Sequence, residues 1–146
     1  MSLSLALLLS STPVADAAPK PAREETEHGD KQLDLCIYNS KGTNVEFSIC
    51  YRDALQRADD KLNAIWKVAL ADVGGRTSEG GKALVAEQRA WITFKEKSCD
   101  FYWAKDFGSL HRSIIGPSCR LDVVNARIKQ LEDITDFFTA YRRDDA

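Results

Sequence analysis

The chain has 146 residues, about the size of one domain, and a formal charge of −2 with acidic and basic residues interleaved. Such a balance leaves no basic stripe for nucleic acid, which argues against a nucleic-acid-binding protein. No apolar run reaches the roughly 20 residues of a membrane span, and the four cysteines are even in number, as in exported proteins with disulfides.

The N-terminal residues have the pattern of an export signal. An apolar run at 3–9 is followed by Ala-Asp-Ala at 15–17, a small-x-small pattern that precedes signal-peptidase cleavage. We therefore expect residues 1–17 to be a signal peptide and the protein to be periplasmic or secreted. The charged segment 18–31 has almost nothing to bury, so it is predicted to be a flexible leader.

The first long helix is predicted to begin at Thr43 and to end at Gly74 and Gly75. Thr43 and Glu46 have the spacing of a capping box, in which each side chain satisfies a free backbone N–H of the first turn. Apolar residues then recur every three or four positions, which indicates one buried helical face. The residues of this face are Phe47, Tyr51, Leu55, Ala58, Leu62, Ile65, Trp66 and Ala69.

A second helix is predicted from Ser78 to about Asp106. Apolar side chains cover roughly half of its circumference, which is too broad for a helix with one neighbour. We therefore expect this helix to lie between the other two, with its aromatic residues mainly in the core. The apolar positions are Leu84, Val85, Trp91, Ile92, Phe94, Cys99, Phe101, Tyr102 and Trp103.

A third helix is predicted to follow Gly116 and Pro117, because proline suits the first turn of a helix. The chain is thus expected to form one all-α domain over 32–142, a small bundle of three main helices whose first two form an antiparallel hairpin. The charged tail 143–146 is expected to fray. The apolar stripe of the third helix consists of Leu121, Val124, Ile128, Leu131, Ile134, Phe138 and Tyr141.

The four cysteines are expected to form two disulfides. Cys50 lies twenty-five residues before Gly75 and Cys99 twenty-four residues after it, so an antiparallel hairpin would bring these two level. We predict a Cys50–Cys99 bond, which leaves Cys36 to pair with Cys119. The alternative, Cys36–Cys99 with Cys50–Cys119, stays open. The cysteine spacing contains no C-x-x-C pair, so no metal site is expected.

No arrangement of residues suits catalysis. His111 is the only histidine of the predicted domain, and the cysteines are expected to be oxidised, so a nucleophile with an adjacent base is missing. The two glycine pairs lack the lysine and hydroxyl residue of a phosphate-binding loop. We therefore expect a binding protein without a cofactor rather than an enzyme.

Four polar residues fall on or beside the predicted buried faces: Asp59 and Asn63 in the first helix, Gln88 and Lys95 in the second. Folding the hairpin at Gly75 would bring Asn63 near Gln88 and Asp59 near Lys95. The favoured interpretation is a buried polar network that fixes the register of the helices, because buried polar groups normally pair internally. A buried ligand site is the alternative.

Several short motifs are specific in combination. They are A-D-x-x-L-N at 58–63, Leu84 with Q-x-A-W-I at 88–92, three of the cysteines, and Arg127 with Leu131. Together they resemble the N-terminal family of the lysozyme inhibitor LprI, a group of exported bacterial domains. The resemblance implies a small disulfide-bonded helical fold and, for the name-giving member, inhibition of lysozyme. A lysozyme is then the expected partner; the alternative function is an envelope adaptor or ligand-binding protein.

The connection between the second and third helices is predicted to be a loop with mixed chemistry. An inhibitor of lysozyme must fill a cleft that contains two carboxyl groups. We expect Arg112 and His111 to face those carboxyl groups, with Leu110 and Ile114 on the cleft walls and Lys105 as a further positive charge. An ordinary connector whose apolar residues close the bundle is the alternative. The oligomeric state stays open.

Overall fold

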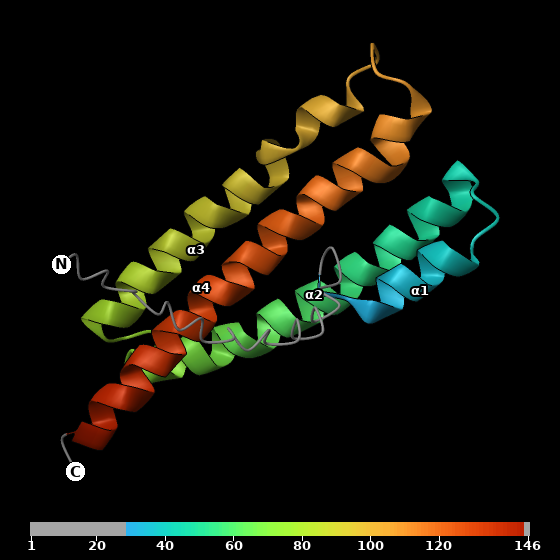
Figure 1. Ribbon diagram of the computed structural model, residues 1–146. Helices are drawn as coiled ribbons and strands as arrows, with labels where there is room; N and C mark the ends of the chain where they lie inside the picture. The colour runs from blue at the N-terminus through green and yellow to red at the C-terminus, as the bar shows by residue number, and fades with distance from the viewer. Residues whose placement is uncertain (1–28, 145–146) are drawn as a thin grey trace, which may run out of the picture.

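Four α-helices make up most of the protein in a computed structural model, which describes residues 29–144 (Figure 1). No strand occurs in this range, so the predicted all-α class is confirmed, with four helices in place of three main ones. The predicted signal peptide and residues 18–28 and 145–146 lie outside the described range. The elements are α1 (Lys31–Asn39), α2 (Asn44–Asp72), α3 (Glu79–Ser98), the 3₁₀ segment η1 (Asp100–Trp103), the π-helical segment η2 (His111–Ile115) and α4 (Gly116–Asp144).

Helix α1 is an addition to the predicted fold, and its first residue lies in the segment predicted as a leader. Asp30 caps it, because the carboxylate accepts hydrogen bonds from the backbone N–H groups of Gln32 and Leu33 at 2.9 and 3.1 Å. The same carboxylate pairs with Arg57 of α2, with 2.6 Å between Nη2 and Oδ2. Leu33 is buried in the core. The folded domain therefore includes Asp30.

Helices α2 and α3 begin where the sequence predicts. The Thr43 hydroxyl accepts from the Glu46 backbone N–H at 3.2 Å, and the Glu46 carboxylate accepts from the Thr43 N–H at 3.3 Å, which completes the capping box. Ser78 caps α3 by accepting from the Gly81 N–H at 2.9 Å. Between the two helices the chain reverses at Gly74, whose φ of 92° lies in the left-handed region that favours glycine.

Helix α4 lies between α2 and α3 and packs along α2 (Figure 1). The apolar stripes predicted for these two long helices meet there and form the core, which confirms the period of α2 and that of α4 as far as Ile134, whereas Tyr141 is exposed. The buried stripe residues are Tyr51, Ala58, Leu62 and Ala69 of α2 and Leu121, Val124, Ile128 and Leu131 of α4.

The position of α3 corrects the prediction that it is the central helix. Leu84 is buried and Trp91 half-buried, but Ile92, Phe94 and Phe101 have exposed fractions of 47%, 57% and 56%. The chain reverses between α2 and α3 as predicted, and the two helices then diverge with α4 between them (Figure 1). Periodicity identifies the apolar face of a helix; it does not identify the neighbour that covers this face.

Both disulfide pairings considered from the sequence are wrong. The structure joins Cys36 to Cys50 and Cys99 to Cys119. The Cys50–Cys99 prediction assumed that α2 and α3 stay side by side, whereas they diverge. Equal distance from a turn does identify a pair at the connection between α1 and α2. Cys36 and Cys50 each lie seven residues from Thr43 in this connection, and they are bonded. Two disulfides without a free cysteine among the described residues are typical of an oxidising compartment.

Peptide mapping without reduction tests the pairing. Trypsin should release peptide 32–41 bound to 42–52, and peptide 98–105 bound to 113–120. Replacing either cysteine pair with serine should lower the free energy of unfolding by about 3 kcal/mol, because short loops of this size lose about that much chain entropy when closed. A peptide 42–52 bound to 98–105 would contradict the observed pairing.

The Asp30–Arg57 pair should stabilise the domain in a pH-dependent way. Burial raises the pKa of the Asp30 carboxyl. The hydrogen bonds from Arg57 and from the backbone of Leu33 and Gln32 together lower this pKa by more than burial raises it, so it lies below the ordinary value of 3.8. A carboxylate with a lowered pKa stabilises the fold above the unfolded-state pKa, and this contribution is lost as pH falls through the folded-state pKa.

The variant Asp30→Asn removes the charge and keeps the helix cap, since asparagine also caps helices. It therefore measures the contribution of the ion pair alone. Denaturant titration at neutral pH should show a loss of about 0.5 to 1 kcal/mol, the size of a partly exposed ion pair. The difference from wild type should shrink as pH falls below 3.8. A difference that stays constant over this pH range would show that the ion pair contributes nothing.

Candidate functional site

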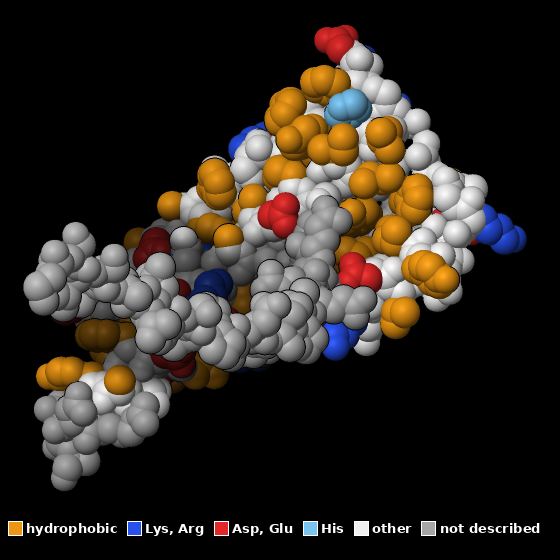
Figure 2. Space-filling view, viewed as in Figure 1, with side chains coloured by type: hydrophobic (Ala, Val, Ile, Leu, Met, Phe, Trp, Pro, Cys, Tyr) orange, Lys and Arg blue, Asp and Glu red, His pale blue; other side chains and the backbone are white. Residues whose placement is uncertain are grey.

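Exposed hydrophobic side chains gather at the end of the molecule opposite the C-terminus (Figure 2). At this end η1, η2 and the turn between them lie beside the start of α2, where the Asn44 side-chain amide donates to the Ser109 hydroxyl at 2.9 Å. Val45, Phe101 and Leu110 are each more than half exposed. We name this end the tip surface and define it by Val45, Ile49, Phe101, Phe107, Leu110, His111 and Arg112.

A series of ring contacts orders the tip surface. Phe101 lies 3.9 Å from Tyr102 and 5.8 Å from Phe107 between ring centroids, and Phe107 stacks on His111 at 4.9 Å. Aromatic contacts of this kind contribute about 0.5 to 1.5 kcal/mol each beyond the area that they bury. The rings therefore hold one another in place although Phe101 remains exposed to solvent.

The prediction of a loop between the second and third helices is wrong, because much of this segment is helical. Residues His111–Ile115 form η2, which continues directly into α4, and the Gly116 N–H donates to the His111 carbonyl five residues earlier. Pro117 has no N–H to donate, and the wider π turn lies directly before it. The segment is therefore a helical extension of α4. Single π turns of this kind are frequent at functional sites.

The five residues predicted to bind a partner lie in different environments. Lys105, Leu110 and Arg112 are exposed, and Arg112 Nη1 donates to a backbone carbonyl of the preceding turn at 3.2 Å. Ile114 packs against the core, so it serves the fold. His111 is half-buried and stacks on Phe107, and its Nδ1 is buried without a hydrogen-bond partner among the described residues. Three of the five side chains are thus exposed to solvent.

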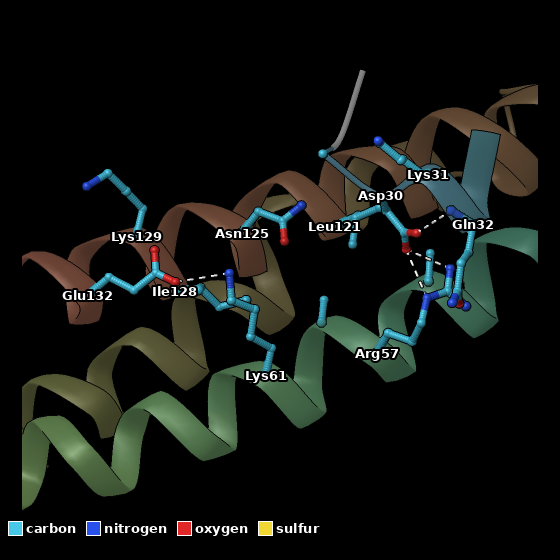
Figure 3. Close-up of a pocket in the computed structure, with 13 residues that line it drawn as sticks. Asp30, Lys31, Gln32, Arg57, Lys61, Leu121, Asn125, Ile128, Lys129 and Glu132 are labelled. Carbon is cyan, nitrogen blue, oxygen red and sulfur yellow. Dashed lines mark hydrogen bonds and ion pairs between the residues drawn. The ribbon is translucent and has the colours of Figure 1, made fainter. Parts of the chain in front are cut away.

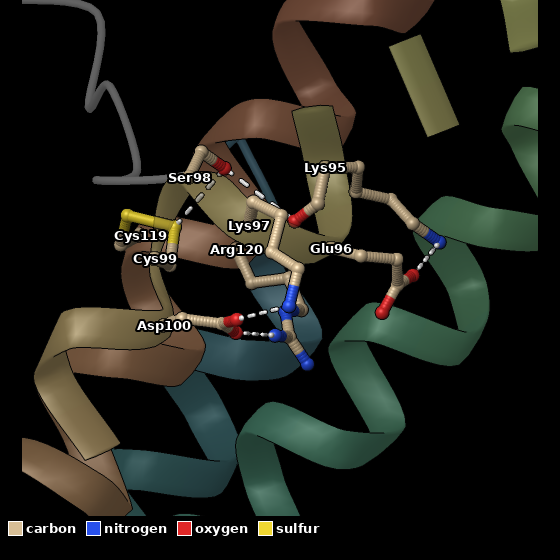
Figure 4. A network of polar contacts seen from close by, with 8 residues as sticks. All are labelled: Lys95, Glu96, Lys97, Ser98, Cys99, Asp100, Cys119 and Arg120. Atoms are coloured by element: carbon tan, nitrogen blue, oxygen red, sulfur yellow. Dashed lines mark hydrogen bonds and ion pairs between the residues drawn. A yellow bond between two sulfur atoms is a disulfide. The ribbon is translucent and has the colours of Figure 1, made fainter. Parts of the chain in front are cut away.

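Covalent and polar contacts fix the base of the tip surface (Figure 4). The Cys99–Cys119 disulfide joins the end of α3 to the first turn of α4. Asp100, at the start of η1, lies 3.4 Å from the Lys97 ammonium and 3.6 Å from the Arg120 guanidinium. These contacts connect η1 to both neighbouring helices, which limits the movement of the aromatic residues that η1 carries.

The four polar residues predicted to share a buried network do not come together in the described part of the chain. Gln88 accepts a hydrogen bond from Nε of Arg127 on α4 at 2.9 Å. Lys95 pairs with the next residue in the chain at 3.3 Å. Asn63 is exposed and Asp59 half-buried, and no side-chain hydrogen bond or ion pair joins either one to Gln88 or Lys95 within that part.

A different polar network has Arg127 at its centre. This side chain is only 2% exposed, and its guanidinium donates to Glu87, Gln88 and Gln130 and lies 6.0 Å from the Trp91 ring centroid. The network joins α3 to α4, which suits it to fixing the register of these helices. Its signal in the sequence is an arginine inside the apolar stripe of α4, where a charge requires buried partners.

Other chemistries find no support among residues 29–144. No group of three or more histidine, cysteine, aspartate or glutamate side chains there is arranged to hold a metal ion. Within the same range, every helix is too short or too polar to cross a bilayer. The tip surface, with aromatic and aliphatic side chains beside an exposed arginine, has the composition of a protein–protein interface core.

The close approach of α4 to η1 should make this region sensitive to the residue at position 116. A Cβ added to Gly116 would lie 2.7 Å from Cη2 of Trp103, with two more ring atoms at 2.9 Å. Gly116→Ala should therefore displace the ring, lower the free energy of unfolding by about 1 to 3 kcal/mol and change the near-ultraviolet circular dichroism. Gly108→Ala is the matched control, because a Cβ there meets nothing within 4 Å. Equal stability of the two variants would contradict this packing.

Comparison with known proteins identifies the family. The family model described as "Lysozyme inhibitor LprI" matches residues 36–131, well over half of the chain. This range contains both disulfides, the meeting stripes of α2 and α4, and the whole tip surface. No curated protein and no solved structure matches the chain. The protein therefore belongs to the LprI family of lysozyme inhibitors.

Proposed function

We propose that this protein inhibits a lysozyme by inserting the tip surface into the active-site cleft of the enzyme. Membership of the LprI family supports inhibition as the function. The observation that carries the choice of surface is the cluster of exposed aromatic and aliphatic side chains beside an exposed arginine at the projecting end of the molecule. Binding energy in protein interfaces is concentrated in such side chains and in arginine.

The shape of this end suits a cleft. The turn between η1 and η2 projects beyond the helical body (Figure 1). Its base is held by the Cys99–Cys119 disulfide and by the packing of α4 on η1, so little conformational freedom is left to lose on binding. A preorganised surface loses less entropy when it binds, which favours affinity. In the complex, Leu110 and Phe101 pack on the walls of the cleft.

The charges near the tip complement those of a glycosidase. Lysozymes cleave the glycosidic bond with two carboxyl groups in an open cleft. Arg112 is exposed and oriented by its 3.2 Å hydrogen bond to the preceding turn, and Lys105 is exposed nearby in sequence. In the proposed complex Arg112 pairs with a catalytic carboxylate. His111 acts as a positioning residue, because it stacks on Phe107 and is only half-exposed.

A lysis assay with a panel of lysozymes tests this function and its surface. Leu110→Ala/Arg112→Ala should weaken inhibition by about 10- to 100-fold, because truncating two central interface residues commonly costs that much. The matched control is Lys67→Ala/Val68→Ala, which also removes one exposed base and one exposed aliphatic side chain, but from α2 far from the tip. The control should inhibit as wild type does, and both variants should keep the thermal stability of wild type.

The outcomes separate the surface from the function. Equal inhibition by both double variants would remove the tip surface from the mechanism. Absence of inhibition by wild type against the whole panel would remove the inhibitor function and favour the envelope adaptor. His111→Phe, which retains a ring against Phe107, should inhibit better than His111→Ala if the role of this residue is to position its neighbours.

A further inference from the structure

A groove of about 620 Å³ lies between the N-terminal end of α1, the middle of α2 and the first half of α4 (Figure 3). Its residues are separate from those of the tip surface. The apolar part of its lining consists of Ala54 and Ala58 of α2 and Leu121 and Ile128 of α4. A volume of this size is in the range of sites that bind small ligands.

The groove is positive on a protein whose net charge is negative. Four basic and two acidic side chains line it, a balance of +2, whereas the whole chain has a formal charge of −2. Asp133 pairs with Lys129 beside the groove, and Asp136 also lies near this lysine, so the surplus of positive charge lies on the α1 and α2 side of the groove. That side of the groove therefore attracts anionic ligands.

Both acidic side chains of the lining are already engaged. Arg57 holds Asp30 at one end, where Asp30 also caps α1. Lys61 of α2 reaches across to Glu132 of α4 at 3.0 Å, although this lysine remains largely exposed (Figure 3). An incoming carboxylate can take the place of Glu132 at Lys61, since both partners can return to water at little cost.

The cationic groups are spread around the groove. Lys31, Lys61 and Lys129 come from three different helices, and Figure 3 shows them at separate points around it. One compact anion would contact only one or two of them. Several carboxylates along an extended chain can each meet a different lysine, because every ammonium group forms its own ion pair.

The dimensions fit a short peptide with small side chains. From Leu121 to Glu132 the α4 side of the groove spans about 16 Å at 1.5 Å per residue of helix. An extended peptide covers that length with about five residues at roughly 3.3 Å each. The floor of the groove is hollow at Ala54 and Ala58 because their side chains are small. Peptide side chains about the size of a methyl group fill this hollow without displacing the helices.

We propose that this groove binds a short, extended acidic peptide in which carboxylate side chains alternate with small apolar ones. The carboxylates pair with Lys31 and Lys61 and compete with Asp133 for Lys129, and the methyl groups contact the apolar floor. Exposed ion pairs are each weak and screened by salt, so the binding is modest and decreases with ionic strength. This site does not depend on inhibition of lysozyme through the tip surface.

Isothermal titration calorimetry at low salt with the full chain tests the proposal. The probe is the hexapeptide acetyl-(Glu-Ala)₃-amide, and acetyl-(Gln-Ala)₃-amide is its neutral control. The acidic peptide should bind saturably, and the neutral peptide should bind at least about 10-fold more weakly, because it loses every ion pair. Added salt should weaken only the acidic peptide.

Protein variants locate the site. Lys31→Gln/Lys61→Gln should weaken binding by about 5-fold, whereas Lys67→Gln/Lys82→Gln, which removes two exposed lysines outside the groove, should leave it unchanged. Glu132→Gln should strengthen binding by about 3-fold, because it frees Lys61 from its internal partner. Affinity should thus fall in the lysine variant and rise in the Glu132 variant. This pair of opposite changes distinguishes a binding site from general attraction to lysines.

Three results would overturn the proposal. They are the absence of saturable binding at millimolar peptide, equal binding of the neutral peptide, and an equal loss of affinity in the control lysine variant. Lysozyme inhibition measured on the same groove variants should match wild type. Groove variants should lose peptide binding and keep inhibition, whereas tip variants should lose inhibition and keep peptide binding. These two patterns distinguish the groove from the tip surface.

Discussion

The packing of α4 along α2 is the contact on which the other elements depend. Both helices have 29 residues, and their apolar stripes meet in a core that contains Leu62, Leu121, Ile128 and Leu131. Burying one such side chain contributes about 1.5 to 3 kcal/mol. Neither α1 nor α3 forms a comparable interface with any other element. Both therefore fold against a surface that the two long helices provide.

Covalent and polar links supplement the small apolar contacts of α1 and α3. Helix α1 buries Leu33 and is joined to α2 by a disulfide and by the Asp30–Arg57 pair. Helix α3 buries Leu84 and is joined to α4 by the second disulfide and the Arg127 network. Small exported domains commonly add disulfides because their cores are limited in size. Here each disulfide lies beside a turn, and one of them also forms the base of the tip surface.

The same arrangement leaves two surfaces with different chemistry. The divergence of α2 and α3 ends in a projecting turn whose rings are only partly covered, so a cluster of exposed apolar side chains lies at the tip. The groove between α1, α2 and α4 instead has a shallow apolar floor and a cationic rim. We propose a large folded partner for the first surface because rings gain most from desolvation, and a small flexible anion for the second because its lysines are separated.

The family and the class of fold could be predicted from the sequence because they depend on local signals. The capping residues Thr43 and Ser78, the glycine turn and the apolar periods of α2 and α4 act within a few residues of one another. Helix α1 was not predicted, because it has only nine residues and follows a charged segment directly. The π turn of η2 was likewise missed, since the mixed chemistry of its residues is also typical of a loop.

For the candidate site, the sequence identified Leu110 and Arg112 as surface residues of mixed chemistry, which the structure leaves exposed. It did not place Phe101 and Val45 beside them, because these positions come from other elements and meet only in the folded chain. The central position of α4, the cysteine pairing and the Arg127 partner of Gln88 were also decided by the tertiary structure. A helical period specifies which face of a helix is apolar, but the neighbour that covers this face is selected only when all of the faces pack together.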